Sequence, residues 1–129
     1  MTTLDELCAT DEIQRLKARY CRAVDHKDWD ALGNVFTADA KLFHGETGID
    51  GCDAIVAVIR DTLADFSTSH CAHTPLIDIT GATTATGNWG AIYTRVGDPP
   101  SFGEYDEDHE LGRDGSWRIR CMRLTDALS

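Results

Sequence analysis

The spacing of apolar residues changes near residue 66, and this change limits the folds open to the chain. Before it, apolar residues recur every three or four positions, as on one face of a helix. The clearest case is the stripe formed by Ile13, Leu16, Tyr20, Ala23 and Val24. After it, segments rich in Thr, Ile, Tyr and Trp are separated by short turns, which is typical of strands. Helices first and an antiparallel meander afterwards predict an α+β domain with its helices on one face of a curved sheet.

Capping residues and turn residues set the expected element boundaries. The Thr3-x-x-Glu6 pattern predicts a short opening turn, and Thr10 is expected to begin a longer helix that ends near His26. Asp28 is expected to cap the next helix. The remaining expected elements are a strand over 38–44, a glycine loop over 45–51, a helix from about 55 to 66, and strands over 70–80, 83–96, 101–111 and 117–124.

Length and charge narrow the class of protein. The 129 residues predict one domain over 1–129. The net charge of −10 disfavours nucleic acid and anionic membrane surfaces as partners. The longest apolar run, 54–59, is too short to span a bilayer, and the N-terminal segment lacks an export pattern. A cytoplasmic protein is therefore expected.

The chain has no recognisable metal or cofactor motif. Its five cysteines are scattered without a C-x-x-C pair, which predicts reduced and mostly buried thiols, with Cys71 a small buried residue. The acidic run over 104–110 lacks the glycine that a calcium loop requires. Its pattern predicts instead a strand with one solvated face. We expect neither a metal nor a cofactor.

Asp25 and two strand histidines are the residues that most suggest chemistry. Asp25 is a carboxylate at the negative end of a helix, which is unfavourable unless it ends the helix, is solvated or has a partner. His70 and His73 are three positions apart, so a regular strand places them on opposite faces. The residues alone leave open whether either histidine is functional or structural.

Five segments in order resemble the SnoaL-like group of the nuclear transport factor 2-like superfamily, across nearly the whole chain. They are Tyr20-x4-Asp25-x2-Asp28-Trp29-Asp30-x-Leu32-x3-Phe36-x2-Asp39-Ala40, Gly51-x3-Ile55, His70-x2-His73-x-Pro75-x-Ile77-x-Ile79, Thr84-Ala85-Thr86-Gly87-x-Trp89 and Asp114-Gly115-x-Trp117-Arg118-Ile119. The resemblance implies a cone-shaped α+β barrel, in which a curved antiparallel sheet wraps around three helices and an apolar pocket. It also implies a homodimer.

Within this group the chain resembles scytalone dehydratase and bile-acid 7α-dehydratase, and hexachlorocyclohexane dehydrochlorinase shows the same kind of Asp–His pair. In those families an aspartate at a helix end orients a pocket histidine that acts as a general base. By motif position this implies Asp25 and His70, with Tyr20 as an acid or oxyanion donor. Further residues are candidates to line the pocket or bind substrate: Trp29, Phe43, His73, Trp89, Tyr93 and Arg123. Arg120 and Arg123 are expected on opposite faces of the last strand.

The predicted function is a cofactor-free lyase, catalysing dehydration or another β-elimination, or a related isomerase. The resemblance implies a hydrophobic cyclic small molecule as its substrate. Two alternatives remain open at this point, a pocket protein that binds a small ligand without catalysis and a dimerisation module of the same fold.

Overall fold

The structure is a computed structural model that describes residues 3–127. The first two residues of the N-terminal segment considered above lie outside this range. In chain order the elements are α1 (Leu4–His26), α2 (Trp29–Gly33), β1 (Phe36–His44), β2 (Thr47–Asp50), α3 (Cys52–Leu63), β3 (Thr68–Ile79), β4 (Thr84–Arg95), β5 (Ser101–Leu111) and β6 (Trp117–Asp126).

Helix α1 is continuous from the first cap to the predicted end. Thr3 caps it, accepting a hydrogen bond from the backbone N–H of Glu6 at 3.2 Å. A separate helix beginning at Thr10 is therefore a wrong prediction, because Thr10 lies inside α1 and donates its hydroxyl hydrogen to the Glu6 carbonyl at 2.9 Å. The helix ends at Lys27, whose φ of 59° turns the chain out of the helix. Asp28 caps α2 as predicted, accepting from the N–H of Ala31 at 3.1 Å.

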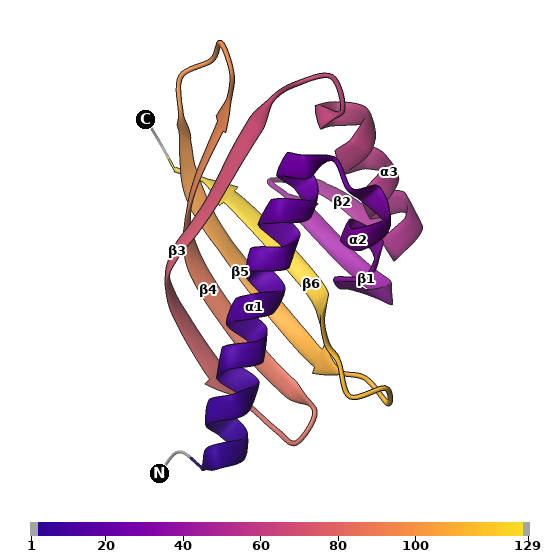
Figure 1. Ribbon diagram of the computed structural model, residues 1–129, viewed down its shortest axis with the longest axis vertical. Coiled ribbons are helices and arrows are strands. Elements are labelled where there is room, and N and C mark those ends of the chain that lie inside the picture. The colour runs from indigo at the N-terminus through magenta and orange to yellow at the C-terminus, as the bar shows by residue number, and fades with distance from the viewer. Residues whose placement is uncertain (1–2, 128–129) are drawn as a thin grey trace.

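The six strands form one curved sheet in the order β2-β1-β6-β5-β4-β3 (Figure 1). The predicted α+β class is confirmed, with two differences. Strands β1 and β6 pair in parallel, so the sheet is mixed rather than antiparallel throughout. The sheet is also open, with β2 and β3 at its edges, rather than closed into a barrel. The expected glycine loop over 45–51 contains β2, which pairs with β1.

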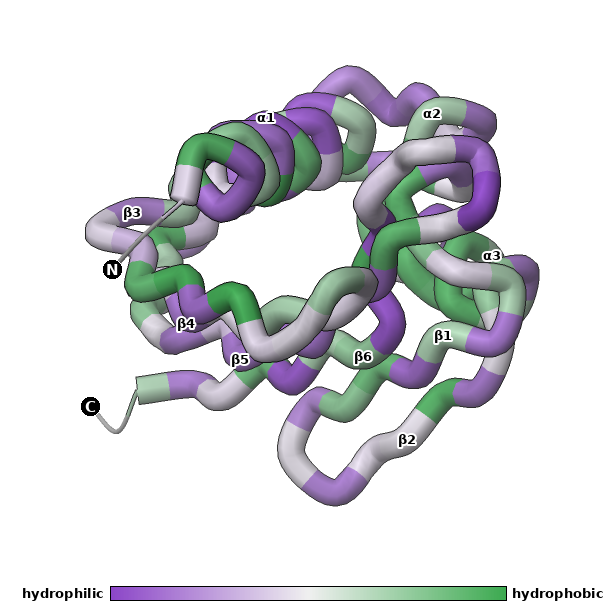
Figure 2. Tube along the Cα trace, turned by 90° about the horizontal axis from the view of Figure 1, so that it is seen from below, coloured by the Kyte–Doolittle hydropathy of each residue, from purple (hydrophilic) through white to green (hydrophobic). Residues whose placement is uncertain are grey.

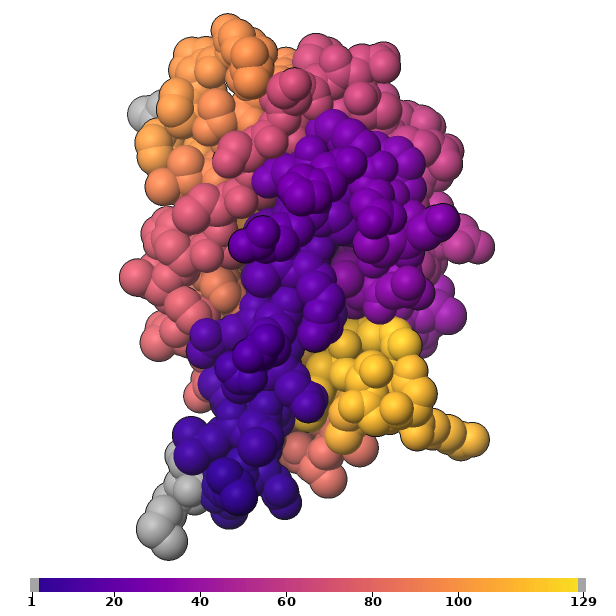
Figure 3. All heavy atoms as spheres, viewed as in Figure 1, coloured from indigo at the N-terminus to yellow at the C-terminus, as the bar shows by residue number. Residues whose placement is uncertain are grey.

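The helices cover the concave face of this sheet. Seen from below, α1 lies across from β4, β5 and β6 (Figure 2), and in the space-filling view it runs down the front of the molecule (Figure 3). The predicted apolar stripe of α1 is buried throughout. It packs against inward side chains of the sheet: Trp89, Tyr105, Ile119 and Met122.

Two β-bulges change which side chains face inward. In β3 the pairing shifts between His73 and Leu76, where Thr74 has a φ of 47°. As a result Ile77 is half-buried on the side of His70, whereas Leu76 is exposed. Strict alternation along the strand would place Leu76 on the side of His70 and Ile77 on the opposite side, and it fails beyond the bulge.

The second bulge lies in β6, where Ile119 pairs with His109 and Cys121 pairs with Asp108, leaving one residue unpaired between them. That residue is Arg120. Its guanidinium lies 3.8 Å from Glu110, and Arg123 lies 2.6 Å from Asp108, so both arginines meet outward-facing carboxylates of β5. The prediction that they lie on opposite faces is wrong because the bulge shifts the alternation by one residue.

All five cysteines are free, but only Cys21 is buried. Cys8 and Cys71 are exposed, so the prediction of mostly buried thiols is wrong. Cys71 is exposed because it follows His70 on the strand and therefore faces away from the helices. Among residues 3–127, no helix is both long enough and apolar enough to cross a membrane.

Candidate functional site

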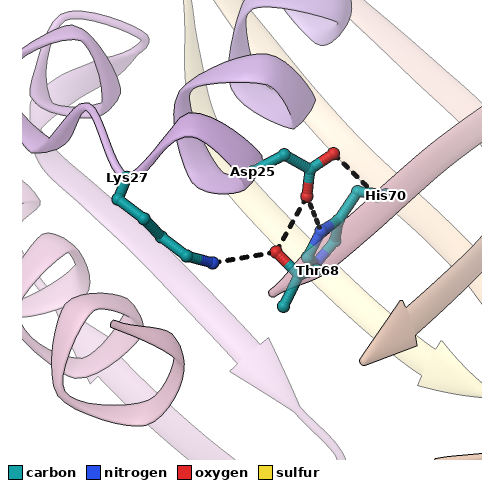
Figure 4. Close-up of polar contacts among 4 residues, drawn as sticks. All are labelled: Asp25, Lys27, Thr68 and His70. Carbon is teal, nitrogen blue, oxygen red and sulfur yellow. Dashed lines mark hydrogen bonds and ion pairs between the residues drawn. The ribbon is translucent and has the colours of Figure 1, made fainter. Parts of the chain in front are cut away.

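A carboxylate and an imidazole meet where α1 ends against β3. Nδ1 of His70 lies 2.7 Å from Oδ1 of Asp25 (Figure 4). The side chains are 11% and 20% exposed, respectively, so solvent screens the pair only partly. This contact joins residues 45 positions apart in the chain.

Three hydrogen bonds fix the carboxylate of Asp25. Besides the ring contact, the backbone N–H of His70 donates to Oδ2 at 2.9 Å, and the hydroxyl of Thr68 donates to Oδ1 at 3.0 Å. Lys27 donates from Nζ to the Thr68 oxygen at 2.9 Å, which brings a positive charge close to the carboxylate. These contacts offset the unfavourable position of Asp25 at the negative end of the helix dipole.

The carboxylate also selects the tautomer of His70. An ionised carboxylate only accepts hydrogen bonds, so Nδ1 of the imidazole carries the hydrogen of this contact. In a neutral ring the lone pair then lies on Nε2. Because His70 lines a cavity, Nε2 is the nitrogen through which it can act as a base on a bound molecule.

The cavity next to His70 has a volume of about 310 Å³ and is largely apolar. Its walls come from the concave face of the sheet, from one face of α3 and from Tyr20 of α1. The residues that line it are Tyr20, Leu42, His44, Thr47, Ile49, Val58, Ile59, Thr62, Leu63, His70, Tyr93, Tyr105, Met122 and Leu124. A small, largely apolar molecule with few polar groups suits such a lining.

Tyr20 gives the cavity a buried hydroxyl. Its ring packs edge-on against Phe36 and Tyr105, with centroid distances of 6.1 and 5.9 Å. Burial raises the pKa of Tyr20 well above its usual range, and the neighbouring Tyr105 only partly opposes this. Tyr20 is therefore a neutral phenol at physiological pH. A neutral phenol can donate its hydrogen to a bound molecule.

A second imidazole–carboxylate pair lies at the edge of the same cavity. Nε2 of His44 lies 2.9 Å from Oδ2 of Asp126, and the hydroxyl of Tyr93 donates to Oδ1 of Asp126. Tyr93 in turn stacks on His70, with ring centroids 6.1 Å apart. Sequence reasoning proposed no role for His44 or Asp126. The available signal was alternation with Leu42, which places His44 on the inward face of its strand.

Sequence reasoning also missed a buried ionic cluster behind the cavity. Nζ of Lys17 lies 2.5 Å from Oε2 of Glu107, and His109 lies 3.1 Å from the other oxygen of Glu107. The ammonium of Lys17 also lies 3.3 Å from the ring centroid of Tyr105, a cavity residue. The signal for Lys17 was its place four residues after Ile13 on the apolar stripe.

The charges of this cluster affect one another. Burial raises the pKa of Glu107, but Lys17 and His109 together outweigh it, so the net pKa is lowered and the carboxylate is ionised. Burial lowers the pKa of Lys17, and Glu107 opposes that change. Nδ1 of His109 is buried without a hydrogen-bond partner among the described residues. The other ring nitrogen, Nε2, is the one that contacts Glu107.

Five residues predicted to bind substrate do not line the cavity. Trp29 begins α2 and lies beside a groove between α2 and α3. Phe43 alternates outward between inward neighbours, and the ring of His73 lies over Gly90 on the outer side of β4. Trp89 is buried in the core, and Arg123 is bound to an outward carboxylate. Of the predicted site residues, the structure brings together Tyr20, Asp25, His70 and Tyr93.

A larger hollow of about 670 Å³ lies elsewhere, between the start of α1 and the β3–β4 turn. Its titratable side chains are carboxylates and a thiol: Asp5, Glu6, Glu12 and Cys8. It therefore lacks the pairing of an acid with a base that the smaller cavity has. Within residues 3–127, no group of three His, Cys, Asp or Glu side chains is arranged to hold a metal ion.

Solved structures of similar fold include proteins whose names are those of a dehydratase and a dehydrochlorinase. A provisionally assigned scytalone dehydratase from Novosphingobium aromaticivorans matches with a TM-score of 0.85 at 21% identity, covering 95% of this chain and 86% of that one. A type 2 hexachlorocyclohexane dehydrochlorinase matches with a TM-score of 0.85 at 19% identity, covering 98% and 90%. A Mycobacterium tuberculosis protein of unknown function matches with a TM-score of 0.87 at 24% identity, covering 95% and 79%.

At these identities the likeness concerns the fold alone. The family is established by a direct match to the model of the SnoaL-like domain, which extends over residues 5–123. This range contains the Asp25–His70 pair and every residue that lines the cavity except Leu124. The chain therefore belongs to the SnoaL-like domain family.

Proposed function

We propose that the protein is a cofactor-free lyase that catalyses a dehydration or another β-elimination on a hydrophobic cyclic molecule, or an isomerase that moves a proton on one. The observation that carries the proposal is the 2.7 Å contact between Asp25 and His70 beside a largely apolar cavity. The similar structures that bear the names of a dehydratase and a dehydrochlorinase support it.

In this proposal Nε2 of His70 removes a proton from a carbon next to a carbonyl or leaving group. Asp25 keeps Nδ1 protonated and stabilises the imidazolium that forms. Tyr20 donates its hydroxyl hydrogen to the oxygen on which negative charge develops. A positioned base of this kind contributes a factor of about 10²–10⁴ in rate.

The test combines binding with turnover. Cyclic hydroxyketones, steroids and polyketide fragments are screened by thermal shift against the wild type, and the ligands found are then followed for consumption. His70→Gln should still bind them, while its kcat/KM falls by a factor of about 10²–10⁴. His26→Gln makes the same change at an exposed helix residue and should behave as wild type.

Two outcomes would contradict the proposal. Ligands that bind but are never consumed would point to a binding protein, in which Asp25 and His70 have a structural role. Turnover that His70→Gln leaves intact would mean that another group supplies the base.

A further inference from the structure

The pair formed by His44 and Asp126 has no role in the proposal above, although it belongs to the same cavity. His44 and Tyr93 both line that cavity, from β1 and β4. Asp126, near the end of β6, accepts hydrogen bonds from both. Nε2 is the ring nitrogen of His44 that contacts Asp126, which leaves Nδ1 for another partner.

Tyr93 connects the two imidazole–carboxylate pairs. Its ring stacks on His70 at 6.1 Å with an interplanar angle of 18°, and its hydroxyl binds the carboxylate that holds His44. Tyr93 therefore contacts both pairs, His70 through its ring and Asp126 through its hydroxyl. The side chains of His44 and Asp126 are 48% and 55% exposed, so water reaches this pair more readily than it reaches His70.

An elimination that releases a hydroxyl group needs two proton transfers. A base takes a proton from carbon, and an acid gives one to the departing oxygen, because hydroxide is a poor leaving group. His70 meets the first need. Tyr93 donates to Asp126 and its pKa is raised, so its hydrogen is already engaged. His44 faces the same cavity, and Asp126 stabilises its cationic form.

Building on the proposed function, we propose that His44 is its general acid, with Asp126 and Tyr93 as positioning residues. Nε2 of His70 takes the proton next to the carbonyl, and the electrons of that C–H bond form the C=C bond. The C–O bond then breaks with its electron pair on oxygen, and the proton of His44 completes a water molecule. The substrate class is a cyclic β-hydroxy ketone, and the products are the conjugated enone and water.

The test compares two leaving groups on one ring system. The probes are 3-hydroxyindan-1-one, whose leaving group needs a proton, and 3-chloroindan-1-one, whose chloride leaves without one. Both give the same enone, so a single absorbance assay of initial rates, corrected for the reaction in buffer, serves for both.

His44→Gln should lower kcat/KM for the hydroxy probe by a factor of about 10²–10⁴ and leave that for the chloro probe almost unchanged. Asp126→Asn should show the same selectivity with a smaller loss. His70→Gln should lower both rates, and His26→Gln neither.

The outcomes separate this inference from the proposed function. If both probes are consumed through His70 and His44→Gln lowers both rates equally or neither, His44 is not the acid, and the proposed function stands. If the wild type consumes neither probe, the β-hydroxy ketone assignment is overturned, and the proposed function remains to be judged by the wider panel.

Discussion

Lys17 and Glu107 form an ion pair inside the core, with Nζ of Lys17 2.5 Å from Oε2 of Glu107 and both residues 2% exposed. The pair joins α1 to β5 behind the tyrosine side of the cavity. Removing two charges from water costs several kcal/mol each, and only close mutual contact offsets that cost. Both residues must therefore be present for either to be tolerated in the core.

Replacing Lys17 alone should destabilise the protein strongly. Lys17→Met leaves the Glu107 carboxylate buried without its cation, and we expect the free energy of unfolding to fall by about 3–5 kcal/mol. Adding Glu107→Gln should recover most of this loss, since the amide oxygen still accepts from His109. Urea denaturation measures both. Arg15→Ala is the control, because it removes an exposed ion pair on the same helix and should cost under about 1 kcal/mol. Equal losses in the single and double variants would contradict this account.

The same cluster predicts sensitivity to acid. The pKa of Glu107 is lower when folded than its usual 4.5, so the unfolded chain takes up the proton more readily. The stability contributed by Glu107 is thus complete above pH 4.5 and is lost as the pH falls through the folded pKa. Urea midpoints between about pH 6 and pH 3 should fall more steeply for wild type than for Lys17→Met/Glu107→Gln. If the urea midpoints of the two proteins fall equally with pH, other carboxylates control acid unfolding.

Asp25→Asn should reduce both activity and stability. The amide removes the charge that stabilises the His70 imidazolium, so we expect kcat to fall by a factor of about 10²–10⁴ with KM little changed. Weaker hydrogen bonds to His70 and Thr68 should lower the free energy of unfolding by about 1–3 kcal/mol. Steady-state kinetics and urea denaturation measure the two effects. Asp30→Asn, at an exposed position of α2, should change neither. Retention of full kcat by Asp25→Asn would rule out its proposed role.

Tyr20 should give no alkaline limb to the pH–rate profile near pH 10. Burial raises the pKa of its phenol above the usual 10.0, so the hydroxyl stays protonated as the pH rises through that value. A fall in kcat/KM near pH 10 that disappears in Tyr20→Phe would contradict this. At neutral pH, Tyr20→Phe should lower kcat/KM by a factor of about 10²–10³, since it removes a donor to the developing oxyanion.

Gly103 lets β5 and β6 lie close enough to place Asp126. A Cβ at this position would lie 2.3 Å from the backbone oxygen of Thr125. Backbone cannot swing away as a side chain can, so Gly103→Ala should cost about 1–3 kcal/mol and weaken the hold of Asp126 on His44. A Cβ at Gly90 would meet only the ring of the exposed His73, which can rotate, so Gly90→Ala is the mild comparison. Thermal unfolding of the two variants tests this, and an equal decrease in their melting temperatures would contradict it.

Most elements were predictable because their signals are local. The α1 stripe, the Asp28 cap and the strand over 101–111 each depend on residues close in sequence. The parallel pairing of β1 with β6 was not predictable, because it joins segments about 80 residues apart through backbone contacts that carry no side-chain signature. The bulge at Thr74 was equally hidden, since a left-handed threonine is set by its tertiary surroundings.

The residues of the candidate site were also predictable only in part. The contact between Asp25 and His70 was foreseen from the family pattern, which encodes their positions. His44 was not, because its partner Asp126 is 82 residues away and no local pattern connects them. The sequence analysis placed Glu107 in a strand with one solvated face, and the side chains of β5 do alternate between the two faces of the sheet. What the sequence did not reveal is that its inward face would bury a carboxylate opposite Lys17.

The position of β6 between β1 and β5 has a consequence for synthesis. A ribosome makes β6 after every other strand of this sheet, yet β6 is the strand that joins the β1–β2 hairpin to β3, β4 and β5. Until residues 117–126 leave the exit tunnel, the nascent chain has two separate pieces of sheet, each with an unpaired edge. Folding of this chain therefore finishes only after translation of its last strand, and a pause before that point prolongs the interval in which chaperones or neighbouring nascent chains can bind those edges.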